Sequence, residues 1–246
     1  MCALRWLSTQ LDRIQEAQQI KRSPTYRDLD PKLNEIRLLH ILPAKRGKRI
    51  ECRLSHASID DEQARYQALS YVWGAQLEQL RDVLNIRHIF VDDKVVAITR
   101  NLEVALRHIR DEQDEVVLWV DALCINQFNL AEKSSQISIM GKIYQRAYKV
   151  LAWLGQEDQH AKPAYQLIRT LTRLSYLTVS HSSMAGAKLT PQVFRDAGIE
   201  VSDLPWESLA SLFRRPYWSR MWVIQELYHA DSTGAGYCGL RTIDES

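Results

Sequence analysis

Apolar positions along the chain follow two periods, and their order predicts the fold class. Continuous apolar runs rich in β-branched and aromatic residues, typical of buried strands, begin at Tyr66, Val116 and Val150. After Asn101 and after Asn129 the apolar residues recur every three or four positions, as on the inner face of a helix. With two shorter β-like runs before Asn101, the order is strand, hairpin, helix, strand, helix, strand. This order indicates an α/β domain with a mostly parallel sheet flanked by helices.

Both central helices have a start signal and an apolar face. Asn101 is expected to cap the first helix, and Asn129 with Glu132 three residues later has the spacing of a capping box for the second. The expected inner faces are Leu102, Ala105, Leu106 and Ile109 in the first helix and Ile137, Met140, Ile143, Tyr144 and Ala147 in the second. The two short β-like runs begin at Val83 and His88, and Asp92-Asp93 supplies turn residues before a further run at Val95.

The N-terminal quarter is predicted to hold a helix and a hairpin. Residues 1–20 carry apolar residues at helical spacing with charges between them, which indicates an amphipathic lead-in helix. The runs at 35–43 and 49–54 are β-like, and Gly47 supplies the turn that joins them. The turn is rich in lysine and arginine, which favours a solvated loop; a nuclear-localisation cluster is the alternative interpretation.

The C-terminal half departs from the strand–helix alternation. Residues 161–200 are expected to be helical and then looser around His181, as in an insertion on the domain surface. Asp203 is predicted to begin a helix with Trp206, Leu209, Ala210 and Phe213 facing inward, and Pro216 to open a second helix that runs to about His229.

Composition narrows the class of protein. The chain has 46% hydrophobic and 25% charged residues, close to the average for globular proteins, and 32 basic side chains nearly balance 30 acidic ones. The balance argues against nucleic acid as the main partner, and no apolar stretch is long enough to predict a membrane span. The N-terminus meets Arg5 and Asp12 before any signal-peptide core, so we expect a cytoplasmic protein. The scattered cysteines Cys2, Cys52, Cys124 and Cys238 lack metal-ligand spacing, which predicts reduced thiols and no metal site.

Four segments resemble the heterokaryon incompatibility (HET) domain of fungal proteins. They are Tyr66-Gln-Ala-Leu-Ser-Tyr-Val-Trp-Gly, Asn101-Leu-Glu-Val-Ala-Leu-Arg-His, Leu118-Trp-Val-Asp-Ala-Leu-Cys-Ile-Asn-Gln with Glu132 and Gln136 to Tyr144, and Arg215-Pro-Tyr-Trp-Ser-Arg-Met-Trp-Val-Ile-Gln-Glu. The resemblance covers about Tyr26 to Gly239 and implies a role in non-self recognition and programmed cell death. It divides the chain into an N-terminal extension, 1–28, and a HET domain, 29–246, with core blocks 66–155 and 203–239 and an insertion at 156–202.

A second resemblance, to TIR domains, suggests a reaction and a TIR-like or flavodoxin-like arrangement. Ala68-Leu-Ser-Tyr, a later strand that ends on an aspartate, and Ser219-x-x-Trp222-x-x-x-Glu226 look like TIR signature positions, and many TIR domains cleave NAD with a glutamate at the last of these. The resemblance implies that Glu226 is the catalytic carboxylate. A carboxylate beside Trp222 would also suit stabilisation of an oxocarbenium-like ribose. The alternative for Glu226 is a structural acid paired with a nearby arginine such as Arg220 or Arg214.

Two strand ends supply the candidate substrate pocket. Ser70, Tyr71, Trp73 and Gly74 end the first strand at the edge where ligands bind in open α/β sheets, and Asp121, Asn126 and Gln127 follow the next. These side chains could line a nucleotide pocket and bind ribose hydroxyls or an amide. The alternatives are that Tyr71 and Trp73 are core aromatics, that Gly74 is a turn, and that Asp121 holds its own loop. Cys124 has no local nucleophile signature that would make a thiol hydrolase with His108 or His229.

Two functions from different classes follow. The first is a cell-death effector that hydrolyses NAD as a substrate, without a bound cofactor. The second is a non-enzymatic module that self-associates or recruits other incompatibility proteins.

Overall fold

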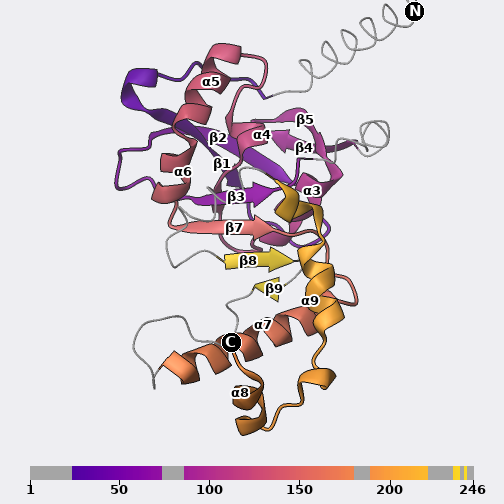
Figure 1. Cartoon of the computed structure of the whole chain (residues 1–246). Helices are drawn as coiled ribbons and strands as arrows, with labels where there is room; N and C mark the ends of the chain where they lie inside the picture. The colour runs from indigo at the N-terminus through magenta and orange to yellow at the C-terminus, as the bar shows by residue number, and fades with distance from the viewer. Residues whose placement is uncertain (1–23, 74–85, 180–188, 221–234, 239–240, 243–246) are drawn as a thin grey trace, which may run out of the picture.

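The computed structural model describes residues 24–73, 86–179, 189–220, 235–238 and 241–242, and these form a mixed sheet with helices around it (Figure 1). Nine strands are hydrogen-bonded in the order β5-β4-β2-β1-β6-β3-β7-β8-β9. The α/β class predicted from the apolar pattern is confirmed.

The centre of the sheet is parallel. Strands β6 (Val116–Trp119), β3 (Gln67–Tyr71), β7 (Lys149–Trp153) and β8 (Ala235–Cys238) pair in parallel, in that spatial order. The apolar runs of β3, β6 and β7 are buried: Leu69, Leu118 and Leu151 are each at most 1% exposed. The carboxyl ends of β3 and β6 therefore lie beside one another at one edge of the sheet.

Antiparallel hairpins extend the sheet on both sides. Strands β1 (Glu35–Ile41) and β2 (Glu51–Ser58) form the predicted N-terminal hairpin, and β4 (Ile86–Val91) pairs with β5 (Lys94–Thr99) through a turn at Asp92-Asp93. Both aspartates have positive φ, 49° and 62°, as that tight turn requires. β1 joins the parallel core by pairing antiparallel to β6, and the short β9 (Arg241–Thr242) pairs with β8.

The helices confirm one predicted cap and correct the other. Asn129 caps α5 (Leu130–Ser138), because its side chain accepts from the Glu132 N–H. Helix α3 (Arg100–Ile109) is instead capped by the Thr99 hydroxyl. The prediction that Asn101 is the cap is therefore wrong. Its side-chain amide donates to Val72 O at 2.8 Å and accepts from Trp153 Nε1 at 2.9 Å, and these bonds connect α3 to the ends of β3 and β7.

The helix predicted after Asn129 is divided. It consists of α5 and α6 (Met140–Arg146), with Ile139 between them. Ile143 and Tyr144 are buried as expected, and Tyr144 packs edge-on against Trp119. The break changes the phase of the apolar face, so Ile137 is 42% exposed instead of facing inward.

The C-terminal helices gather near β7 (Figure 1). Helix α7 (Ala161–Val179) packs on β7 through Ala161 and Ala164, followed by α8 (Pro191–Asp196), η2 (Val201–Asp203), α9 (Trp206–Phe213) and η3 (Pro216–Ser219). The helix predicted from Asp203 begins only at Trp206, and Leu204 and Pro205 before it are not helical. Leu212 is the buried residue of α9, whereas Trp206 and Phe213 are 40% and 54% exposed, so their predicted inward orientation is wrong.

Two further expectations concern the chain ends and membranes. The lead-in helix predicted at 1–20 lies outside the described residues. Within the described residues, none of the helices combines the length and the apolar character needed to cross a bilayer.

Candidate functional site

The loops after β3 and β6, both predicted to carry site residues, are joined by a hydrogen bond. Trp73 Nε1 donates to Asp121 Oδ2 at 2.8 Å, across 48 residues of sequence. Asp121 opens the short helix α4 (Asp121–Cys124), and its second oxygen accepts from the Ala122 N–H at 2.8 Å. The predicted convergence of the two strand ends is therefore present, with the Asp121 carboxylate as the joining group.

A second contact brings the Arg215–Arg220 block to the same strand. The Ser70 side chain, which is fully buried in β3, shares a 2.7 Å hydrogen bond with the Tyr217 hydroxyl and accepts from Arg220 Nη1 at 3.1 Å. The Arg220 guanidinium also lies 5.7 Å from the centre of the Tyr217 ring. Ser70 thus anchors a segment 150 residues further along the chain and is not exposed to a ligand.

Tyr71 lies at the same edge, and its phenol remains protonated. Burial, and to a smaller extent the negative charge of Asp121, raises the pKa of Tyr71 well above its usual value, while Arg220 opposes the shift. Asp121 and Arg220 are therefore both near enough to the phenol to act on it electrostatically. A neutral phenol at this edge can donate a hydrogen bond at physiological pH.

A cavity of about 140 Å³ opens beside these residues. Tyr71, Trp73 and Gln127 line it together with Tyr26 and Phe128 and with the β5 segment 96–99. Ligand pockets for drug-sized molecules are roughly 300 Å³ or larger, so this space suits one aromatic ring rather than a dinucleotide. Trp73 is 42% exposed, which corrects its interpretation as a core aromatic, whereas Tyr71 is buried.

Asn126 and Gln127 mainly bind their own loop. Asn126 Oδ1 accepts from the Phe128 N–H at 3.2 Å, and Gln127 Nε2 donates to Asp121 O at 2.9 Å. Gln127 Oε1 is shielded from solvent and has no hydrogen-bond partner among the described residues, and it belongs to a side chain that lines the cavity. Of Asn126 and Gln127, only Gln127 therefore both lines the cavity and has a side-chain oxygen that accepts no hydrogen bond from the described residues.

A buried ion pair fixes this loop from behind. Arg37 on β1 binds both carboxylate oxygens of Glu132, at 2.6 and 3.0 Å, and donates to Cys124 O at 3.0 Å. Glu132 also accepts from the Asn126 N–H at 2.7 Å. The arginine and glutamate side chains are 1% and 7% exposed. Glu132, predicted to complete a capping box, therefore pairs with Arg37 instead and holds the start of the Asn126 loop.

Three predicted site residues, Gly74, Trp222 and Glu226, lie outside the described residues. The single helix predicted from Pro216 to His229 is wrong at its start. The 3-10 helix η3 ends at Ser219, whose hydroxyl bonds back to Pro216 O, and Arg220 is extended with φ −76° and ψ 132°. Ser219 therefore does not share a continuous helix face with Trp222 and Glu226.

Sequence reasoning missed Arg37 and Tyr217, and gave Arg220 only as a partner for Glu226. An arginine between Ile36 and Leu38 in an apolar strand was the available signal for a buried ion pair. No local pattern indicates that Tyr217 and Arg220 meet Ser70, because that contact depends on how a distant block docks.

The other reactive side chains do not form a site. Cys124 is buried, and burial raises its thiol pKa to about 12, so no thiolate is available at neutral pH. His108 packs instead against Trp153, with ring centres 5.1 Å apart. Within the described ranges there is no group of three or more His, Cys, Asp or Glu side chains arranged to hold a metal ion.

The fold and this edge define the class: an α/β protein whose candidate ligand edge lies at the ends of adjacent parallel strands. Comparison with known proteins then gives the family. The family model for heterokaryon incompatibility protein (HET) matches residues 66–226, so the chain belongs to the HET family. It is 34% identical over 130 residues to heterokaryon incompatibility protein 6, OR allele, of Neurospora crassa. That alignment covers 49% of this chain and 18% of the relative. No solved structure gives a significant match.

Proposed function

We propose that this chain is a cell-death effector of fungal incompatibility that hydrolyses the glycosidic bond of NAD at the β3–β6 edge. The incompatibility role is supported by the family and by the name of the Neurospora relative. The hydrolytic step is supported by one observation above all: the Trp73–Asp121 hydrogen bond brings both predicted pocket loops to one edge.

In this proposal Glu226 is the catalytic carboxylate. Arg220, which is bound to Ser70 in β3, starts the segment that contains Glu226. Six residues of chain span at most roughly 20 Å, and this is the limit that connectivity sets on the separation between Arg220 and Glu226. Its carboxylate would stabilise the positive charge that develops on the ribose as neutral nicotinamide leaves, and water would then complete the hydrolysis.

The described side chains would bind and orient the substrate. The cavity beside Trp73 has room for one ring, and Gln127 Oε1 offers an acceptor to a carboxamide N–H. Asp121 would act by positioning Trp73, since both of its oxygens accept hydrogen bonds from the protein.

Release of nicotinamide from NAD, followed by chromatography, tests the proposal. We expect Glu226→Gln to lower the rate by roughly a hundredfold or more, as removal of a group that acts in the transition state does. Trp73→Ala should raise KM more than it lowers kcat, because it removes binding surface rather than the reacting group. Glu200→Gln, a change at an exposed acid in the segment between α8 and α9, is the matched control. If assembled wild-type protein releases no nicotinamide, or if Glu226→Gln matches it, the hydrolytic proposal fails and a non-enzymatic role is favoured.

A further inference from the structure

The two ends of the β1–β2 hairpin carry opposite charge. The connecting loop holds exposed Lys45, Arg46 and Lys48. Immediately after β2, the turn to β3 holds exposed Asp60, Asp61 and Glu62. β2 has eight residues, which at about 3.4 Å per residue separates the two ends by roughly 27 Å. The two charged ends of one molecule therefore cannot neutralise one another.

The basic loop is held in a fixed shape. Arg110, at the end of α3, donates to the carbonyl oxygens of Lys45 at 3.0 Å, Lys48 at 3.3 Å and Arg49 at 2.8 Å. These bonds use the Arg110 guanidinium as a scaffold beneath the loop. The lysine side chains of the loop therefore project from an ordered backbone.

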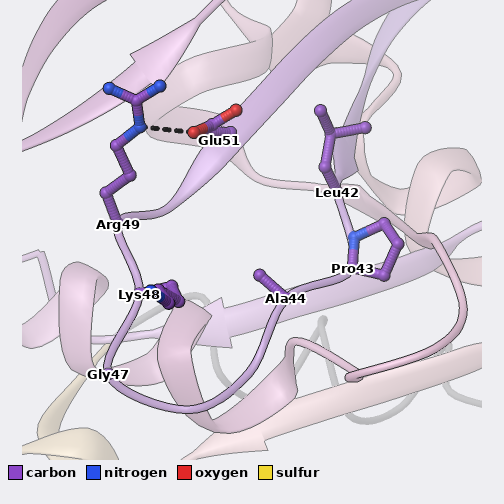
Figure 2. Close-up of a pocket in the computed structure, with 7 residues that line it drawn as sticks. All are labelled: Leu42, Pro43, Ala44, Gly47, Lys48, Arg49 and Glu51. Carbon is purple, nitrogen blue, oxygen red and sulfur yellow. Dashed lines mark hydrogen bonds and ion pairs between the residues drawn. The ribbon is translucent and has the colours of Figure 1, made fainter.

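A cavity of about 510 Å³ lies inside this loop. Figure 2 shows the chain curving around it, with Leu42, Pro43 and Ala44 on one side and Arg49 on the other. One carboxylate lines it, Glu51, which pairs with Arg49. Glu112, which is not part of this lining, accepts from the Arg46 N–H at 3.3 Å. The cavity thus has an apolar wall. These two acids do not form ion pairs with the loop lysines.

The acidic end carries an exposed apolar side chain. Leu33, in the 3-10 helix η1 (Pro31–Leu33), is 60% exposed. Its carbonyl accepts from the Ser58 hydroxyl at 2.8 Å, and Asp60 accepts from the neighbouring Asn34 amide at 2.9 Å. An apolar side chain therefore projects beside three exposed acids, with Lys32 the nearby cation in η1.

We propose that these two ends bind one another between copies of this chain, head to tail. Leu33 of one copy enters the cavity against Pro43 of the next, and the Asp60–Glu62 turn faces Lys45 and Lys48. A contact between two different surfaces of the same molecule propagates, so copies add in a line unless the line closes into a ring. This inference does not depend on NAD hydrolysis, since its test measures assembly alone.

Charge reversal in the full chain tests it by sedimentation velocity. Wild-type protein should self-associate with rising concentration, and roughly tenfold less strongly in high salt, because exposed charges are screened. Lys45→Glu/Lys48→Glu and Asp60→Lys/Asp61→Lys should each be monomeric, since each variant has two ends of like charge. An equimolar mixture of the two should assemble again, as each then meets a complementary end.

Two further variants complete the design. Lys142→Glu/Lys162→Glu changes the same net charge at exposed positions on α6 and α7 and should assemble like the wild type. Leu33→Asp leaves both charged ends in place and should weaken assembly by removing the apolar contact. Wild-type protein that stays monomeric at low salt, charge variants that assemble like the wild type, or a mixture that stays monomeric would each overturn the proposal. An unchanged Leu33→Asp variant would overturn the placement of Leu33.

Discussion

Glu132→Gln should destabilise the protein more than any exposed charge change, because it separates the charges of a buried pair. Arg37 and Glu132 are 1% and 7% exposed and make two hydrogen bonds to one another. The glutamine keeps the shape of the glutamate but leaves the Arg37 charge without a counter-ion. Removing one partner of a buried ion pair typically costs about 3–5 kcal/mol.

The structure places this substitution near the middle of that range. Glu132 also accepts from the Asn126 N–H, so the loss extends to the loop that follows α4. Arg37 keeps its bonds to Cys124 O and Arg27 O, and these carbonyl oxygens compensate part of its charge. We therefore expect a loss near 4 kcal/mol in the free energy of unfolding, a large share of the about 5–15 kcal/mol typical of a domain.

Urea unfolding followed by tryptophan fluorescence measures this loss. The matched double variant Arg37→Met/Glu132→Gln removes the stranded cation, so it should be less destabilised than the sum of the two single variants by at least about 1 kcal/mol. Glu200→Gln, at an exposed acid, should shift stability by less than about 0.5 kcal/mol. A Glu132→Gln variant within about 1 kcal/mol of the wild type, or strictly additive single variants, would refute the reasoning.

Two other predictions concern titratable groups. Burial raises the thiol pKa of both Cys52 and Cys124 to about 12, so iodoacetamide at pH 8 should label them only after unfolding, as peptide mass spectrometry would show; rapid native labelling of either would contradict their burial. A hydrogen bond from His40, and more weakly Arg53, holds the pKa of Glu115 below its usual value, so the pair stabilises the fold above about pH 4.3 and the benefit is lost as pH falls through the lowered pKa. Glu115→Gln should therefore be less stable than the wild type by up to about 1 kcal/mol at pH 6, and the difference should shrink as pH falls through the lowered pKa. A difference that does not change as the solution is acidified would contradict the assignment.

The central strands and helices could be predicted because their signals are local. The buried run at Val116, for example, needs no partner to be identified as a strand, and Asn129 caps α5 through a bond three residues away. The prediction that Asn101 caps α3 was wrong for the opposite reason. Thr99 is also able to cap the helix, and the Asn101 amide instead hydrogen-bonds to Val72 and Trp153, which are distant in sequence.

The site was predictable only in part. Parallel strands end at a common edge, so the approach of the Trp73 and Asp121 loops could be expected from fold class alone. Which atoms meet could not, because Ser70 turns toward Tyr217 and Arg220 instead of toward solvent. Similarly, α9 begins three residues later than predicted and buries Leu212, whereas Trp206, at its first position, is exposed.

The geometry of Asp121 bears directly on which acid performs the proposed hydrolysis. One of its oxygens accepts from Trp73 and the other from the backbone of Ala122, so a substrate hydroxyl would have to compete with bonds already made within the protein. A carboxylate used in this way positions an aromatic wall. The chemical role in the proposal therefore falls on Glu226, and the two acids should respond differently to amide substitution. Asp121→Asn should mainly raise KM by loosening Trp73, whereas Glu226→Gln should mainly lower kcat. If Asp121→Asn lowers kcat as much as Glu226→Gln does, this division of roles is wrong.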